Sequence, residues 1–306
     1  MPPIKLVLIV CCLWVGQLSA QRQYSDTTYL PPAFVSAYSS GEGPAVYIDE
    51  AHNNFHTREG RYAPFAKVLE LDGFRVLSST AEFSRDQLAE MDILVIANAI
   101  PESSLGRWVA PTASAFSEEE IEAVHQWVAD GGRLFLLADH MPMAGAAAEL
   151  AASFGYQFHD SFAEDTLSSS GTMTFSLADG SLSHFALGQS VEGRLAVDSV
   201  STFTGQAFPL PEGAHSVLDC GPSWVVRMPE VAWQFPEGTP WLSASGWSQL
   251  AYQNYGKGKL IISGEAAMFS AQIAEVQDRR FKAGMNSERG RFNYRLLLNL
   301  MRWLAE

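Results

Sequence analysis

Short apolar runs alternate along the chain with segments in which apolar residues recur at helical spacing. The runs predict strands that are buried on both faces. They cover residues 45–48, 74–77, 93–97, 134–138 and 260–262. The helical segments cover residues 62–71, 85–91, 117–130, 144–154 and 291–304. Because strands that alternate with helices form βαβ units, we expect a mostly parallel sheet with helices on both faces.

Local signals mark the ends of several of these elements. Ser117 followed by Glu120 matches a capping box, in which each side chain bonds the backbone of the other residue. Gly131 ends that helix, and Gly73 follows the end of the first one. A further short strand is predicted at residues 156–158, after the alanine-rich helix.

The alternation breaks between residues 161 and 248. This stretch contains turn residues and short alternating runs, and no part of it predicts a helix. We interpret it as a β-rich insertion in one α/β domain that covers residues 45–306. Residues 21–44 are rich in Ser, Tyr, Pro and Gly, which predicts an irregular N-terminal arm.

Residues 1–20 have the pattern of a secretory signal peptide. Lys5 is the only charge before the apolar run Leu6–Val15, and Ala20 ends a small-residue cleavage site. The run is too short to span a bilayer, which takes about 20 apolar residues. We therefore expect a periplasmic or extracellular protein with no membrane insertion after cleavage. A lipid anchor on Cys11 or Cys12 is the alternative.

Charge and cysteine content narrow the set of partners and of stabilising bonds. The net charge of −14 argues against nucleic acid or an anionic membrane as a partner. Cleavage after residue 20 leaves Cys220 as the only cysteine, so we expect no internal disulfide. A packed core must then stabilise the fold by itself.

Polar side chains follow the predicted strands at their carboxyl ends, which is where open parallel sheets bind ligands. The polar residues in these positions are Asp49, His52, Asn53, Asn54, His56, Asn98, Asp139, His140 and Glu265. We expect them to share one crevice that takes a small molecule or a glycan. In that crevice Asn53, Asn54 and Asn98 would orient the substrate.

Four of these residues form a candidate metal site. His52 and His56 are four positions apart, so on a helical turn both could reach one ion. With Asp139 and His140 they offer nitrogen and oxygen ligands, which suit zinc, manganese or iron better than calcium. The alternative is structural, with His56 bonded within a loop and Asp139 capping the next helix.

The sequence favours an activated water over a covalent nucleophile. Many α/β hydrolases hold a serine or cysteine at the turn after the central strand, and here Asp139 and His140 occupy it. Cys220 lies in the irregular region with no obvious base beside it. Glu265 or Asp49 is therefore the predicted catalytic carboxylate, acting as a general base on water.

Large aromatic residues are frequent at the end of the insertion and just after it. These residues are Trp224, Trp233, Trp241, Trp247, Tyr252 and Tyr255. Such rings either stack on sugars or belong to the core.

Several motifs resemble a bacterial group with a class I glutamine amidotransferase-like fold, related to the DUF4350 type of domain of unknown function. The motifs are residues 49–57, 60–65, 202–205, 246–249, 264–269 and 293–303. The resemblance covers nearly all of the chain after the signal peptide, and it implies a flavodoxin-like three-layer sandwich. It does not imply glutaminase activity, because the amidotransferase cysteine has no counterpart at Asp139 and His140.

Two functions from different classes remain open at this point. The first is an exported, metal-assisted hydrolase that acts on a carbohydrate-type or amide-bearing substrate. The second is a non-catalytic envelope protein that binds sugar or peptide in the same crevice.

Overall fold

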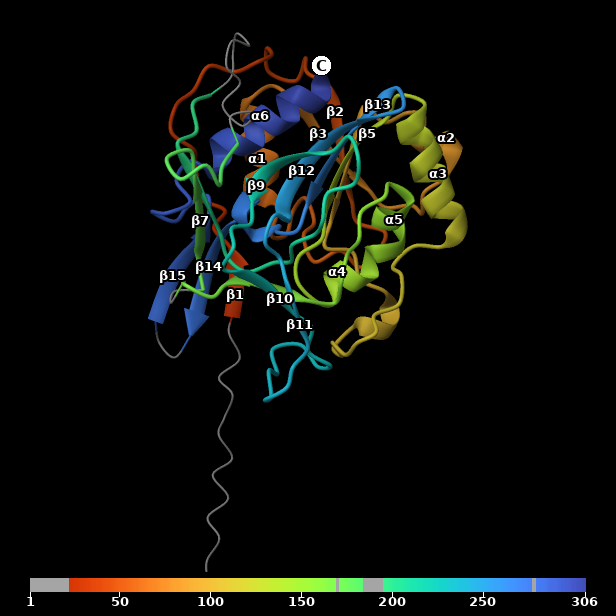
Figure 1. The fold of residues 1–306 in the computed structure, drawn as a ribbon. Helices are drawn as coiled ribbons and strands as arrows, with labels where there is room; N and C mark the ends of the chain where they lie inside the picture. Colours follow the sequence, from red (N-terminus) through yellow and green to blue (C-terminus); the bar gives the residue numbers. More distant parts are fainter. Residues whose placement is uncertain (1–21, 169–170, 184–194, 277–278) are drawn as a thin grey trace, which may run out of the picture.

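The computed structural model describes residues 22–168, 171–183, 195–276 and 279–306. The expected signal peptide at residues 1–20 lies outside the described residues. A seven-stranded sheet forms the centre of the molecule, with helices on both of its faces (Figure 1). No helix of the described segments is long and apolar enough to cross a membrane.

Five parallel strands make up most of this sheet. They are β2 (Ala45–Asp49), β3 (Arg75–Ser79), β4 (Ile93–Ala97), β5 (Arg133–Leu137) and β13 (Gly258–Ser263). Their spatial order is β3-β2-β4-β5-β13, which in chain order is 2-1-3-4-5, the flavodoxin-like arrangement. Two antiparallel strands, β12 (Ser248–Tyr255) and β9 (His215–Asp219), extend the sheet beyond β13.

The side chains of β4 show how the two faces are covered. Ile93 and Val95 point into the core beneath α1 (Ala63–Leu71) and α6 (Asn293–Ala305). The alternate residues Leu94 and Ile96 point into the opposite core. That second core lies beneath α2 (Arg85–Leu88), α3 (Glu118–Ala129) and α5 (Ala148–Ser153). The predicted three-layer sandwich is therefore confirmed.

Some helices and strands end where local sequence signals predict, and others end where tertiary contacts determine it. The capping box is present, because Ser117 accepts from the N–H of Glu120 and the glutamate accepts from the serine N–H. The alanine-rich helix is divided into α4 (Met143–Ala146) and α5. No strand forms at residues 156–158. The side chains of Tyr156 and Phe158 instead pack against the ring of Phe208, so these apolar residues are buried without forming a strand.

Three small antiparallel sheets lie beside the main one, and the first two are formed by the β-rich region. One sheet contains β6 (Phe162–Asp165), β10 (Trp224–Arg227) and β11 (Trp241–Ser243). A second pairs β7 (Met173–Ser176) with β8 (Ser199–Thr202). The third contains β1 (Arg22–Ser25), β14 (Ala271–Val276) and β15 (Arg279–Gly284). The arm expected to be irregular thus begins with a strand, because β1 pairs with a distant segment that local sequence cannot reveal.

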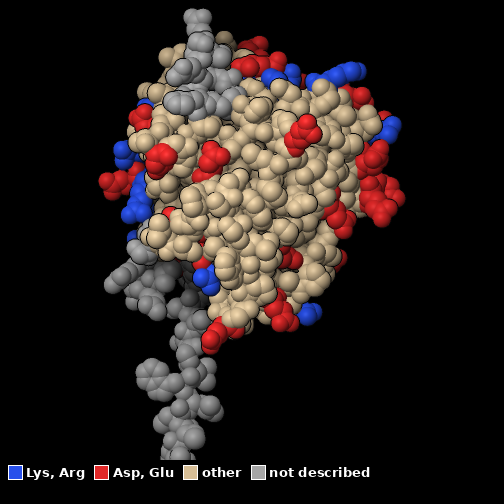
Figure 2. Space-filling view, in the orientation of Figure 1, with Lys and Arg blue, Asp and Glu red and all other residues tan. Residues whose placement is uncertain are grey.

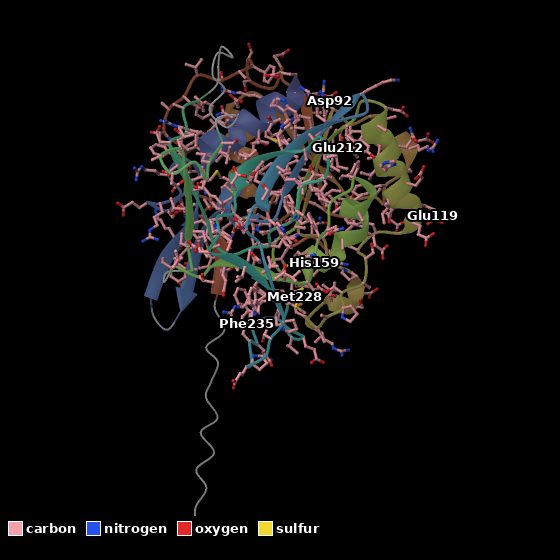
Figure 3. All side chains as sticks on the ribbon, viewed as in Figure 1. Asp92, Glu119, His159, Glu212, Met228 and Phe235 are labelled. Atoms are coloured by element: carbon pink, nitrogen blue, oxygen red, sulfur yellow. The ribbon has the colours of Figure 1, made fainter. Side chains whose placement is uncertain are left out.

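Surface charge is uneven over the molecule. In the view of Figure 2 the central face is largely uncharged, and acidic side chains gather along the edge formed by α3. Figure 3 labels Glu119 on this edge and places Phe235 and Met228 at the other end of the molecule, near β10 and β11.

Candidate functional site

A pocket of about 480 Å³ lies at the carboxyl ends of the parallel strands. His56 enters it from the loop after β2, and Asn98 follows β4 directly. Asp139 and His140 come from the turn after β5, and Glu265 from the turn after β13. The structure thus brings five of the nine predicted site residues together at one end of the sheet.

Asn98 fixes the relative position of two of these groups. It adopts a positive φ of 55°, a conformation that asparagine tolerates better than most residues. Its Oδ1 accepts a hydrogen bond from the backbone N–H of Asp139 at 2.9 Å. Its Nδ2 is therefore the atom that donates to Nδ1 of His56, at 3.1 Å. Both ends of the Asn98 amide are used within the protein, which makes it a positioning residue.

His56 is a neutral histidine with one unused nitrogen. Burial, together with the nearby positive charge of Arg61, lowers its pKa to about 3. Because Nδ1 accepts from Asn98, the ring proton of the neutral form must lie on Nε2. Nε2 is buried and has no hydrogen-bond partner among the described residues.

Glu265 is a buried carboxyl group that favours its protonated form. Burial raises its pKa well above the usual range, and the negative charge of Asp139 acts in the same direction. Backbone N–H groups oppose this shift without reversing it, and that of Met268 donates to Oε2 at 2.7 Å. These backbone donors also hold the carboxyl group in place beneath the pocket.

Aromatic side chains and one cation also line the pocket. Phe55, Trp108, Phe203 and Trp233 contribute rings to its lining. The guanidinium of Arg61 lies over the ring of Phe55, with Cζ 3.9 Å from the ring centroid. Among the described residues, no carboxylate or other acceptor forms an ion pair or hydrogen bond with the side chain of Arg61.

Three predicted site residues belong to an interior network instead of this pocket. The carboxylate of Asp49 accepts from Nδ1–H of His52 at 2.9 Å and from the side-chain amide of Asn54 at 2.9 Å. On the other side of the ring, Nε2–H of His52 donates to Oε1 of Glu120 at 2.8 Å. With their polar atoms committed to each other, Asp49, His52 and Asn54 shape the loop that presents His56.

Asn53 lies in a second pocket that adjoins the first. It has a φ of 47°, and its side-chain amide reaches the carbonyl of Ile100 at 3.4 Å. This pocket has a volume of about 500 Å³. It shares Phe55, Trp108 and Trp233 with the pocket that holds Glu265.

The predicted metal shell is not assembled in this geometry. The described part of the chain contains no group of three or more His, Cys, Asp or Glu residues placed to hold an ion. Both ring nitrogens of His52 already face carboxylates. The free nitrogen of His56 carries a proton, so it can donate a hydrogen bond but cannot ligate. The residues present at His52, His56, Asp139 and His140 therefore do not fit a shared divalent ion.

Sequence reasoning did not place Arg61, Trp108 or Thr204 in the pocket, and it named Trp233 only as one of several aromatic residues that stack on sugars or belong to the core. Arg61 follows the histidine motif closely, and its side chain folds back over Phe55. Trp108 lies in a long loop with no periodic pattern. Thr204 and Trp233 have positive φ angles of 140° and 66°. Positive φ is uncommon for such bulky residues and often marks a functional loop, but no sequence pattern encodes it.

The sequence pattern of the family described as "Domain of unknown function (DUF4350)" matches residues 98–272, which is more than half of the chain. The chain belongs to the DUF4350 family. The matched range includes Asn98, Asp139 and Glu265, and His56 and Arg61 precede it.

Solved structures resemble this DUF4350 protein in fold. The "mmIFT52 N-terminal domain" is 15% identical, with a TM-score of 0.58, and the match covers 85% of this chain and 97% of that one. At this identity the likeness shows the fold alone.

Two more distant matches have lower TM-scores. A putative ThuA-like protein from Bacteroides uniformis is 12% identical, with a TM-score of 0.44 over 89% of this chain and 95% of that one. A putative GMP synthase subunit from Thermoplasma acidophilum is 11% identical, with a TM-score of 0.42 over 86% and 96% of the two chains. No curated protein matches the sequence.

Proposed function

We propose that this DUF4350 protein is an exported hydrolase that cleaves a carbohydrate-type substrate in the pocket at the carboxyl ends of the strands. The observation that carries the proposal is the carboxyl pair in that pocket. Burial and the charge of Asp139 raise the pKa of Glu265 well above its usual range and so favour the protonated form. A pair of carboxyl groups, one protonated and one ionised, is the machinery of most glycoside hydrolases.

The reaction assigns one role to each carboxyl group. Glu265 gives its proton to the oxygen of the bond that breaks, so the leaving sugar departs as a neutral alcohol. Asp139 takes a proton from the water that attacks the anomeric carbon. The C–O bond to the leaving group is replaced by a C–O bond to water. Proton exchange with solvent then restores both carboxyl groups.

The aromatic lining supports a carbohydrate substrate. Trp108 and Trp233 offer flat apolar faces beside the carboxyl pair, and Trp233 is about half exposed. Sugar rings present C–H faces that stack on such residues, while their hydroxyl groups bond to polar residues. The backbone of Trp233 has a positive φ, so its loop is held in an unusual conformation beside the pocket.

The proposal includes neither a catalytic cysteine nor a metal. Cys220 is buried in the core that also contains α1 and α6, and it is not among the residues that line the pocket. Burial raises the pKa of its thiol, which disfavours the reactive thiolate. This supports the view that the protein is not a glutaminase.

Release of new reducing ends tests the proposal. The protein beginning at Gln21 is incubated with a panel of plant and bacterial polysaccharides, and reducing ends are measured over time. Glu265→Gln and Asp139→Asn should each lower the rate at least about 100-fold, as expected for loss of a general acid or base. Glu119→Gln makes the same change on the distant α3 edge and should leave the rate unchanged.

The outcome also separates this function from a binding protein. The adjoining apolar pocket would serve a non-catalytic sugar receptor equally well. If the protein binds polysaccharide but releases no reducing ends, it is a binding protein and the catalytic roles of Glu265 and Asp139 are wrong. If activity survives in Glu265→Gln, that residue is not the acid.

A further inference from the structure

We infer that the pocket selects a ligand with a carboxylate, such as a hexuronic acid, through Nε2–H of His56 and the guanidinium of Arg61. The inference rests on the proposed function only for the view that the ligand is a sugar. Both residues line the pocket that contains Asp139 and Glu265, but the proposed hydrolysis uses neither of them.

The first observation is the unused donor on His56. The backbone N–H of Asp139 can only donate, so the atom of Asn98 that faces it must be the amide oxygen. This fixes the Asn98 amide and, through it, places the imidazole proton on Nε2. His56 is 2% exposed, and a buried donor without a partner destabilises the protein. An acceptor on a bound ligand would remove that destabilisation.

The second observation is the unpaired cation beside it. Burial lowers the pKa of Arg61, and the negative charge of Asp139 only partly offsets this effect. The ring of Phe55 supports one face of the guanidinium and leaves its edge available. The planar fork of N–H groups on arginine matches the two oxygens of a carboxylate.

The donors of the pocket, more than its net charge, favour a carboxylate. Among the described lining residues, Arg61 carries a positive charge and Asp139 a negative charge, while burial favours the neutral form of His56 and the protonated form of Glu265. The protein as a whole has a net charge of −14, which repels anions at long range. A ligand carboxylate would therefore depend on the local pair, Arg61 and His56. A neutral hydroxyl could accept from His56 but would leave the guanidinium without a hydrogen-bonded carboxylate, since Asp139 acts on it only through its charge.

NMR titration of the protein beginning at Gln21 tests this without requiring turnover. The probes are glucuronate, glucose as its neutral counterpart, and inorganic phosphate. Glucuronate should bind at least tenfold more tightly than glucose and should shift the Nε2–H signal of His56. The ¹⁵N shifts of the free protein should identify the Nε2–H tautomer.

Two arginine variants distinguish the site from general attraction. Arg61→Gln should lower the affinity for glucuronate to that for glucose. Arg58→Gln is the control, because Arg58 lies three residues away, pairs with Glu59 and Glu70, and does not line the pocket. It should leave the affinity unchanged.

Three results would overturn the inference. The first is that glucuronate and glucose bind with equal affinity, or that neither binds. The second is that Arg61→Gln leaves the affinity for glucuronate unchanged. The third is that phosphate binds more tightly than glucuronate. Failure of the proposed function looks different, because glucuronate would still bind while no polysaccharide is cleaved.

Discussion

Nε2 of His52 lies 2.8 Å from Oε1 of Glu120, a residue 68 positions later in the chain. Asp49 faces the other ring nitrogen, so the imidazole is held between two carboxylates. Burial lowers the pKa of His52, but the hydrogen bonds and charges of Asp49 and Glu120 outweigh it and raise the pKa above 6.5. The network thus favours the imidazolium form of His52, which joins the loop after β2 to the first turn of α3.

This raised pKa predicts a loss of stability at alkaline pH. A histidine with a folded-state pKa above its unfolded value contributes fully below about pH 6.5. That contribution is lost as pH rises through the raised pKa. Denaturant unfolding from pH 6 to 9 should therefore show a decline that is smaller in His52→Gln. The variant should also be less stable at pH 6 by about 1–3 kcal/mol, because carboxylates lose their donors.

His125→Gln provides the control for this experiment. His125 lies on α3 as Glu120 does, but its ring hydrogen-bonds to Tyr255 and not to a carboxylate of the network. Its replacement should preserve the alkaline decline of the wild type. An identical decline in His52→Gln would show that another group causes it.

Arg302 and Asp72 form a buried ion pair that predicts a large stability effect. Nε of Arg302 donates to Oδ2 of Asp72 at 2.9 Å, and the same carboxylate accepts from the backbone of Ala37. The pair therefore ties α6, α1 and the N-terminal arm together. Asp72→Asn removes the buried negative charge that faces the guanidinium, and it should lower the free energy of unfolding by about 3–5 kcal/mol.

The matched control for this pair is an exposed one. Arg280 is 71% exposed and pairs with Glu275 on the β14–β15 hairpin. Arg280→Gln should change the free energy of unfolding by no more than about 1 kcal/mol. Equal losses in the two variants would contradict the assignment of Asp72 and Arg302 as a core contact.

The parallel part of the fold was predictable because its signals are local. Strand β4 was predicted at residues 93–97, where it is found, since a fully apolar run of five residues suits a strand buried on both faces. The start of α3 followed from its capping box, and its end from Gly131. By contrast, β1 and β14 are defined by pairing between segments about 250 residues apart, as between Tyr24 and Ile273. No window of sequence contains that information.

The candidate site was predictable to the level of strand ends and not of side-chain direction. The rule that ligands bind at the carboxyl ends of parallel strands located Asn98, Asp139 and Glu265. It could not separate His56, which lines the pocket, from His52, which turns inward to Glu120. That choice depends on a partner far away in the sequence. The predicted shell of four metal ligands required both histidines at one point, and the described residues do not provide that arrangement.

Because Cys220 has no cysteine to pair with in the same chain after cleavage, we predict that folding does not depend on oxidation. Cys220 is a free, buried cysteine, and it is the only one that remains if the chain is cleaved after Ala20. Unfolding curves of the protein beginning at Gln21, with and without reductant, should superimpose. A thiol reagent should react with it only after unfolding. A shift on reduction would indicate an intermolecular disulfide bridge. A mass that shows acylated Cys11 or Cys12 would contradict cleavage before Gln21.

Glu265→Gln should stabilise the protein while it removes the proposed activity. The pKa of Glu265 is raised in the folded state, chiefly by burial, so its protonated form contributes stability fully below its unfolded value of about 4.5. That contribution is lost as pH rises through the raised pKa. The amide of glutamine has a similar shape and can still accept from the N–H of Met268, but it never ionises.

The difference between variant and wild type should therefore depend on pH. The two proteins should unfold at similar denaturant concentrations near pH 4. Between the unfolded and the raised pKa of Glu265, the variant should gain about 1.4 kcal/mol over the wild type for each further pH unit. The contribution of His52 cancels in this difference because both proteins contain it. Asp139→Asn should reduce the gain, since removing that negative charge lowers the pKa of Glu265. If Glu265→Gln is no more stable than the wild type at pH 8, Glu265 is ionised at a compensated site and cannot be the proton donor.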